Sequence, residues 1–329
     1  MVVAFPWTET EGWAARLRER HPGVEIAAAP YTERYVDRVP GATAELSDGD
    51  RALWARAEVA LAFEVPAELA TVAPNLRWIQ AINVGIDHLA DRGVAAHVTM
   101  TNVSGISAAS IAEFVLARLL QVWKRLPEID AQQRERRWAH TSGRTAEGRT
   151  VAVIGLGATG TEVARRCRAF GMLTIGTRRS HKPGDTHPAV DELLGPDDLF
   201  DVLGRADVVV ASLPGIAETE NLFDAEAFAA MKPGAIFCNV GRGSLVDEAA
   251  MIAALESGHL GAAIIDVARN EPLPPDDPLW TAPNIYISPH CSASQDQYLD
   301  RVFDFFADNL GRYRRGEDLR NVVDPETGY

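Results

Sequence analysis

One histidine, His290, directly follows a proline in the stretch NIYISPHCSAS (284–294), whose first part predicts a short buried strand. A histidine at the end of a strand is more often packed in the core than used in catalysis. Its imidazole is nevertheless the side chain best suited to exchange a proton near neutral pH. We expect the adjacent Cys291 to be a small buried residue rather than a nucleophile. The role of His290 therefore depends on the groups that the rest of the chain brings to it.

A glycine pattern in the same chain indicates a nucleotide cofactor. The stretch GLGATG supplies Gly155, Gly157 and Gly160 as G-x-G-x-x-G between an apolar run and a predicted helix. The first glycine permits a tight turn, the second lets a pyrophosphate approach the backbone, and the third lets the helix pack on the strand. The first helical residues, Ala158 and Thr159, then offer free amides to the phosphates. The alternatives are a glycine turn without a ligand and a methyltransferase loop that binds a different nucleoside.

Two arginines suggest which dinucleotide is bound. The second strand of such a unit usually ends in an acidic residue that holds the ribose 2′-hydroxyl. Here that strand ends in TIGTRRS, so Arg178 and Arg179 stand where a carboxylate is expected. Guanidinium groups pair with a 2′-phosphate, which a carboxylate would repel. The sequence predicts NADP(H) in preference to NAD(H), with NAD(H) still usable; the alternative is that both arginines only face solvent.

Composition limits the class of protein. A chain of 329 residues is long for one domain and suits two domains with a cleft between them. Its net charge of −14 disfavours a nucleic-acid partner. Three cysteines without CxxC spacing indicate neither a disulfide scaffold nor a metal site. No apolar run is long enough to span a membrane, and the N-terminus turns polar too early for a signal peptide. We therefore expect a cytoplasmic protein.

The elements that must position these residues alternate between strands and helices. Apolar runs at 2–5, 24–29, 59–63, 76–82 and 98–103 predict strands of a first domain. From Ser107 a helix with a serine cap, ended by Pro127, leads to a second domain. Further strands are predicted after the glycine turn, at 173–177, 207–213, 235–240, 262–267 and 285–288. A last helix at about 296–315 is expected to return to the first domain.

The expected fold class is α/β, with two doubly wound parallel-sheet domains. A flavodoxin-like substrate-binding domain comprises residues 1–103 plus 294–329 and is discontinuous. A Rossmann dinucleotide-binding domain comprises residues 104–293. The cleft between them is the expected place of the reaction.

Three further stretches carry a family resemblance: NVGRGSLVDEAAM (239–251), DVARNEPLPPDDPLW (266–280) and SPHCSAS (288–294). Together with the glycine motif, and with NVGIDHL (83–89) and AEFVLARLL (112–120), they resemble the D-isomer-specific 2-hydroxyacid dehydrogenases, in particular the glyoxylate/hydroxypyruvate reductases. Any one of these motifs is unspecific, whereas their order along most of the chain is highly specific.

The resemblance implies a catalytic set of Arg242, Glu271 and His290. Reduction of a ketone by hydride leaves alkoxide character on oxygen, so an imidazolium is needed to deliver a proton. The resemblance assigns that proton to His290, and a carboxylate beside the ring, Glu271, favours its charged form and its orientation. Arg242 is implied to hold the substrate carboxylate and to polarise its 2-oxo group, which suits a planar guanidinium.

The resemblance also implies contacts around these three residues. Backbone amides at Val84 and Gly85 are expected to hold the substrate carboxylate. Asp266 is expected to face the nicotinamide amide, and Thr219 to reach a phosphate. Ile216 departs from the family, which often has a hydroxyl residue there. The remaining residues expected against the cofactor are Leu213, Pro214 and Val240.

We therefore expect an NADPH-dependent oxidoreductase that reduces a small anionic 2-oxo acid, of the glyoxylate or hydroxypyruvate type, to the D-2-hydroxy acid. Phosphoglycerate is disfavoured because LAFEVP (61–66) offers no arginine. Two alternatives stay open: a non-enzymatic, dinucleotide-sensing corepressor, and a formate or phosphite dehydrogenase on the same fold. A homodimer is expected through residues 107–149, where arginine, tryptophan and apolar residues are mixed.

Overall fold

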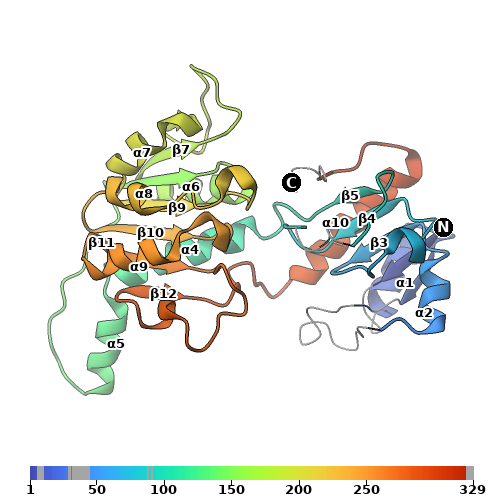
Figure 1. Ribbon diagram of the computed structural model, residues 1–329, viewed down its shortest axis with the longest axis horizontal. Coiled ribbons are helices and arrows are strands. Elements are labelled where there is room, and N and C mark those ends of the chain that lie inside the picture. Colours follow the sequence, from blue (N-terminus) through green and yellow to red (C-terminus); the bar gives the residue numbers. More distant parts are fainter. Residues whose placement is uncertain (6–10, 29–30, 32–44, 87–88, 90–91, 324–329) are drawn as a thin grey trace. The chain divides into compact units, whose positions relative to one another are not determined.

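The computed structural model describes residues 1–5, 11–28, 31, 45–86, 89 and 92–323. The chain divides into two compact units: unit 1 is Met1–Ile106 with Gln297–Tyr329, and unit 2 is Ser107–Asp296. Each boundary lies three residues from the domain boundary expected from the sequence. Each unit is built around its own sheet (Figure 1).

Unit 1 contains a five-stranded parallel sheet in the order β2-β1-β3-β4-β5. Its strands are β1 (Val2–Phe5), β2 (Glu25–Ala28), β3 (Val59–Ala62), β4 (Trp78–Ala81) and β5 (Thr99–Thr101). The apolar side chains of α1 (Glu11–Arg20) and α10 (Tyr298–Arg315) pack on one face of this sheet. Those of α2 (Asp48–Trp54) and α3 (Leu69–Val72) pack on the other face. The C-terminal helix thus completes a unit that the N-terminal strands begin.

Unit 2 contains a seven-stranded parallel sheet in the order β12-β11-β10-β9-β6-β7-β8. Its strands are β6 (Thr150–Ile154), β7 (Leu173–Thr177), β8 (Glu192–Leu194), β9 (Val208–Ala211), β10 (Ala235–Asn239), β11 (Leu260–Ile265) and β12 (Ile285–Ile287). One face is covered by α4 (Ala108–Trp123) and α6 (Ala158–Ala169), and the other by α7 (Leu199–Arg205), α8 (Ala225–Ala230) and α9 (Glu248–Glu256). The strand order reverses between β6 and β9, which is where doubly wound sheets bind ligands at their carboxyl edge.

The predicted fold class is confirmed, because both sheets are parallel and apolar side chains cover both faces of each. The short edge strand β8 was not predicted, since three half-buried residues carry almost no periodic signal. No helix among the described residues is long and apolar enough to cross a membrane.

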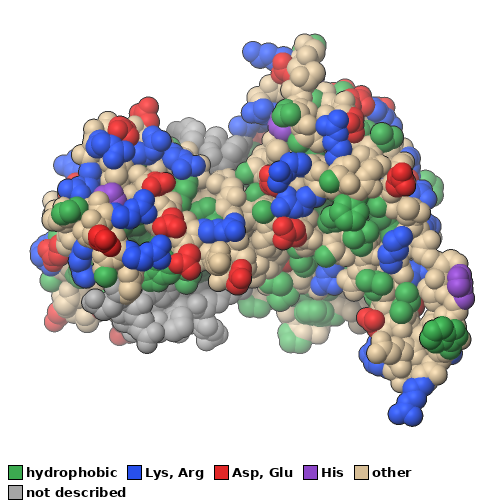
Figure 2. Space-filling model, turned by 180° about the vertical axis from the view of Figure 1, so that it is seen from behind, with side chains coloured by type: hydrophobic (Ala, Val, Ile, Leu, Met, Phe, Trp, Pro, Cys, Tyr) green, Lys and Arg blue, Asp and Glu red, His purple; other side chains and the backbone are tan. Residues whose placement is uncertain are grey.

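The helix expected from Ser107 to Pro127 begins where it was predicted to begin, but its end was wrong. Ser107 occupies the N-cap position of α4, but its side chain makes no capping hydrogen bond. Pro127 does not end a helix; it lies in the first turn of α5 (Leu126–Arg134), after Arg125 turns the chain with φ +54°. Proline suits a first helical turn because no partner is needed there for its missing N–H. No residue of helix α5 is buried. Both apolar and basic side chains lie on the part of the molecule that projects at the lower right of Figure 2.

Candidate functional site

The glycine turn joins the end of β6 to the start of α6. Gly155 has φ +101°, and a Cβ there would lie 2.8 Å from both Leu213 Cδ2 and Ser212 O. A Cβ on Gly160 would lie 2.0 Å from Gly155 O, so the helix rests directly on the turn. Gly157 differs, because a Cβ there would meet no described atom within 4 Å. Packing therefore requires two of the glycines, whereas the third leaves open space beside its backbone.

The first turn of α6 offers its amides at this open space. Gly157 is the N-cap residue and has no side chain to cap the helix. The Thr161 amide is the first of the helix to donate an intrahelical hydrogen bond, to Gly157 O at 3.0 Å. The amides of Ala158, Thr159 and Gly160 precede it, at the positive end of the helix dipole. Free amides, positive potential and space without a side chain are what a dinucleotide pyrophosphate requires, so these residues fit that group.

Two alanine substitutions should separate packing from ligand binding. We expect Gly160→Ala to destabilise the fold by about 1–3 kcal/mol, because its Cβ overlaps the turn. Gly157→Ala should leave the melting temperature unchanged or slightly higher, since its φ of −81° suits alanine. It should instead weaken NADPH binding. Thermal unfolding and fluorescence titration with NADPH measure the two effects; equal melting temperatures for both variants would contradict the assignment.

Arg178 and Arg179 follow the end of β7, beside the glycine turn. The hydroxyl of Thr177, the last residue of β7, accepts a hydrogen bond from the Gly155 amide at 3.3 Å. The Leu156 amide donates to Thr177 O at 2.9 Å. Both arginines are exposed. The structure thus brings these two cations to the same edge of the sheet as the predicted phosphate cradle.

The loop after β9 contacts the turn from the other side. Leu213 lies against Gly155. Thr219 donates its hydroxyl proton to Pro214 O at 2.7 Å and accepts a hydrogen bond from the Ile216 amide at 3.0 Å. In this structure the hydroxyl closes the loop on itself, so its predicted contact with a phosphate stays a prediction.

Arg242 lies in the turn after β10. Val240, the first residue after that strand, is buried. Asn239, the last strand residue, is also buried; its side-chain amide donates to Arg242 O at 2.8 Å, and its oxygen accepts from the Gly241 amide at 3.0 Å. The half-buried guanidinium of Arg242 donates to Gly241 O at 2.9 Å. Sequence reasoning missed Asn239, although a polar residue at the end of a buried strand was a signal.

The structure brings His290 and Glu271 together. His290 Nδ1 lies 2.7 Å from Glu271 Oε2, and the side chains are 41% and 33% exposed. A carboxylate only accepts, so Nδ1 donates and Nε2 is left as the nitrogen that can exchange a proton. Burial alone would raise the pKa of Glu271, but hydrogen bonds from His290 and the Ala268 amide outweigh burial and lower it below its ordinary value. The positive charge of Arg242 acts in the same direction.

Asp266 holds the loop that carries His290. Its carboxylate, 2% exposed, accepts hydrogen bonds from the hydroxyls of Ser288 and Ser292 and from the amides of Cys291 and Ser292. Its carbonyl accepts from the His290 amide at 2.8 Å. His290 has φ +50°, a sparsely populated region that surrounding contacts must stabilise. The carboxylate predicted to face the nicotinamide amide thus bonds to this loop. Cys291, expected to be buried, is exposed, because its side chain lies outside this network.

Val84 and Gly85 lie in unit 1, after the carboxyl end of β4. The Val84 carbonyl accepts a hydrogen bond from the Asn102 side chain at 2.7 Å, and the side chain of Val84 is exposed. Their amides are the predicted ligands of the substrate carboxylate, which stays a prediction. Residues 87–88 of the same motif lie outside the described residues.

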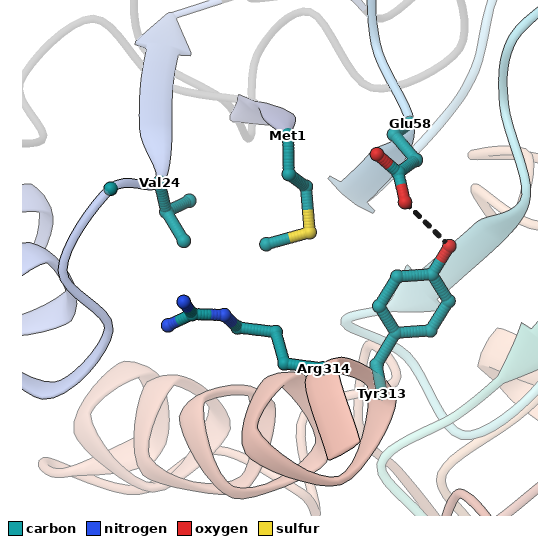
Figure 3. A pocket seen from close by; sticks show the side chains of 6 residues that line it. Met1, Val24, Glu58, Tyr313 and Arg314 are labelled. Atoms are coloured by element: carbon teal, nitrogen blue, oxygen red, sulfur yellow. Dashed lines mark hydrogen bonds between the residues drawn. The ribbon is translucent and has the colours of Figure 1, made fainter. Parts of the chain in front are cut away.

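Unit 1 also has an open pocket that belongs to none of these groups (Figure 3). It lies at the amino ends of β1, β2 and β3, the edge opposite to Val84 and Gly85. In this pocket the Tyr313 hydroxyl donates a hydrogen bond to Glu58 Oε1 at 2.9 Å. Burial together with this bond raises the pKa of Tyr313 to about 12. Ligands of parallel α/β sheets bind at the carboxyl edge, so this pocket is not the candidate site. Its lining residues are Met1, Gly23, Val24, Glu58, Tyr313 and Arg314.

Comparison with known proteins gives one family. Residues 116–292 match the model described as the NAD binding domain of D-isomer specific 2-hydroxyacid dehydrogenases. A D-3-phosphoglycerate dehydrogenase of Mycobacterium tuberculosis is 37% identical over 79% of this chain, which covers 49% of that protein. The chain therefore spans about half the length of the first such relatives.

Two relatives match over nearly their whole length. Glyoxylate/hydroxypyruvate reductase B of Citrobacter koseri is 32% identical over 88% of this chain and 92% of its own. The crystal structure of a D-isomer specific 2-hydroxyacid dehydrogenase from Xanthobacter autotrophicus, in complex with NADPH and MES, matches with a TM-score of 0.82. Its sequence identity is 31%, and the match covers 100% of this chain and 99% of that one.

Proposed function

This chain belongs to the family of D-isomer specific 2-hydroxyacid dehydrogenases, and we propose that it reduces a small 2-oxo acid, of the glyoxylate or hydroxypyruvate type, to the D-2-hydroxy acid with NADPH. The observation that carries the proposal is the pair of His290 and Glu271, 2.7 Å apart. It lies in the same unit as Arg242 and the glycine turn. The turn, Arg242 and His290 follow the carboxyl ends of β6, β10 and β12, three strands of one parallel sheet.

In the proposed reaction each of these residues has one task. The chemistry that a bound reduced nicotinamide dinucleotide supplies is hydride transfer. His290 delivers a proton from Nε2 to the carbonyl oxygen as that oxygen gains negative charge. Glu271 keeps the ring oriented by accepting the Nδ1 hydrogen bond, and its own lowered pKa keeps it ionised at neutral pH. Arg242 pairs with the carboxylate of the substrate.

A panel of 2-oxo acids, assayed with NADPH and with NADH, tests this function. We expect loss of NADPH absorbance with glyoxylate or hydroxypyruvate. NADPH binding without turnover of any 2-oxo acid would favour the dinucleotide-sensing alternative. Oxidation of formate or phosphite, measured as formation of reduced cofactor, would favour the alternative of a formate or phosphite dehydrogenase.

Phosphoglycerate is a second candidate substrate, favoured by the identity to phosphoglycerate dehydrogenases. The stretch 61–66 without arginine favours the smaller acids. Oxidation of 3-phosphoglycerate with kcat/KM above that for glycolate or glycerate would reverse this order.

We propose NADP(H) as the preferred cofactor, with Arg178 and Arg179 on the 2′-phosphate. Their position beside the glycine turn supports this, as does the NADPH-bound relative. Arg178→Asp should lower the efficiency ratio of NADPH to NADH about 10-fold to 100-fold, because it removes a charge-assisted hydrogen bond worth about 1.5–3 kcal/mol. Arg301→Asp, which makes the same charge change at an exposed position of α10, is the control. An unchanged ratio in Arg178→Asp would refute the assignment.

We also propose a homodimer formed through residues 107–149. The apolar side chains of Leu126, Ile129 and Trp138 are 42%, 41% and 104% exposed. Apolar side chains gathered with arginines on a helix that buries nothing suit a subunit contact. Light scattering should give twice the chain mass, and Ile129→Asp should lower it; a wild-type monomer at micromolar concentration would rule the dimer out.

The three free cysteines agree with a reducing cytoplasm as the proposed location.

A further inference from the structure

The side chain of Arg269 joins three separate segments of unit 2. Its Nη2 donates to the Asn221 side-chain oxygen, to Ser244 O at 3.2 Å and to Val246 O at 3.0 Å. Its Nη1 lies 3.5 Å from Glu220 Oε1. The guanidinium therefore contacts the end of the loop after β9 and the segment after Arg242. Arg269 itself lies two residues before Glu271.

The backbones of two of these segments are also in close contact. A Cβ on Gly243 would lie 2.0 Å from Ala268 C and 2.4 Å from Arg269 N, so no larger residue fits between them. The Arg269 amide donates to Glu248 Oε1 at 2.7 Å, at the start of α9. Main chain and side chain at position 269 thus both hold the 266–271 segment against the segment that carries Arg242.

Each joined segment carries part of the proposed reaction. The loop after β9 contains Leu213 and Pro214, the turn after β10 contains Arg242, and the third segment contains Glu271, the partner of His290. A planar group with several fixed donors can serve acceptors on two segments besides its own at once, and lysine lacks this geometry. Arg269 is 34% exposed and its contacts are within unit 2, so the joint needs no ligand or partner chain.

We propose that Arg269 is a positioning residue that fixes the placement of Arg242 relative to the Glu271–His290 pair. The proposal rests on the proposed reductase function for its kinetic consequence. Arg242 must bind the carboxylate, and His290 must protonate the carbonyl oxygen, of the same small molecule. A shift of the order of 1 Å between them costs up to about 100-fold in rate.

The test compares Arg269→Ala and Arg269→Lys with Arg168→Ala. Arg168 is the matched control, because it too donates to a carbonyl, Pro188 O at 3.0 Å, and pairs with a carboxylate, Asp191 at 3.2 Å. We expect Arg269→Ala to lower kcat with the 2-oxo acid about tenfold or more. The Kd of NADPH should change by less than about threefold, since the glycine turn is untouched. Arg168→Ala should stay within about twofold of wild type in both.

Chemical rescue distinguishes positioning from general damage. Millimolar guanidinium chloride should restore part of the kcat of Arg269→Ala, and sodium chloride at equal concentration should not. Arg269→Lys should be impaired as well, because it keeps the charge and loses the fork. Arg269→Lys also tests the proposal if the alanine variant fails to fold. Wild-type kcat in both Arg269 variants would overturn the proposal.

Hydrogen exchange gives a readout that does not depend on activity. The amides of 244–246 and of 268 should exchange faster in Arg269→Ala and Arg269→Lys than in wild type or Arg168→Ala. Unchanged exchange in these segments would contradict the proposal that Arg269 holds them together. If wild type reduces no 2-oxo acid, the proposed function fails, and exchange alone then decides whether Arg269 joins the segments.

Discussion

His290→Asn should lower kcat for reduction of the 2-oxo acid by about 10²- to 10⁴-fold, the usual contribution of a general acid. Asparagine occupies similar space and still tolerates the left-handed φ of +50° at this position, so the loop should keep its shape. It has no group that gives up a proton near neutral pH. NADPH binding, measured by fluorescence, should therefore stay close to wild type while turnover is lost.

His259→Asn is the control for this result, since His259 is a half-buried histidine of the same unit whose ring bonds to a backbone carbonyl, Met231 O at 3.0 Å. It should keep wild-type kcat. Turnover retained in His290→Asn would remove the basis of the proposed mechanism, because no other described side chain bonded to Glu271 can supply the proton.

The pH dependence follows from the lowered pKa of Glu271. A carboxylate with a lowered pKa keeps its charge until the pH falls below its ordinary range, so Glu271 should cause no loss of activity between neutral pH and about 5. The acidic limb of the kcat profile measures this; a loss of activity between neutral pH and about 5 that Glu271→Gln removes would contradict the assignment.

Arg242→Gln should produce the second large effect, on kcat/KM. Removing one partner of a desolvated, hydrogen-bonded charge pair costs about 2–5 kcal/mol, which corresponds to about 30-fold to several thousandfold in kcat/KM. Arg242→Lys should recover only part of this loss, because an ammonium cannot bind a carboxylate in bidentate fashion. Steady-state kinetics with glyoxylate and NADPH measures both variants, with Arg168→Lys as the control.

The preference for an anionic substrate tests the assigned contact directly. Wild type should strongly prefer a 2-oxo acid to the corresponding 2-oxo amide. In Arg242→Gln this preference should fall sharply, since the charged group that pairs with the carboxylate is gone. A variant that keeps the wild-type preference would show that another residue binds the carboxylate.

Local patterns were enough to predict much of the fold and the glycine turn. The glycines of the 155–160 turn and the apolar strand before them are read from adjacent residues, because a tight turn and a buried strand each depend on short-range sterics and burial. The misjudged helix at Pro127 shows the limit of such reading. A proline fits both the end of one helix and the first turn of the next, and only the φ of Arg125 separates the two.

The residues that hold the proposed catalytic set could not be found this way. Asp266 bonds to Ser288 and Ser292, more than 20 positions away along the chain, and Arg269 bonds to Asn221 at a separation of 48. No periodicity links such pairs, since they meet only when parallel strands bring their carboxyl ends to one edge. Sequence alone supported the family, the two α/β units, the glycine turn and the types of the proposed catalytic side chains, because these follow from local composition and spacing. Tertiary structure decided that His290 bonds to Glu271, that Asp266 bonds to the loop of His290 and that Arg269 bonds to the segment after Arg242, because hydrogen bonds depend on distances that chain order does not specify.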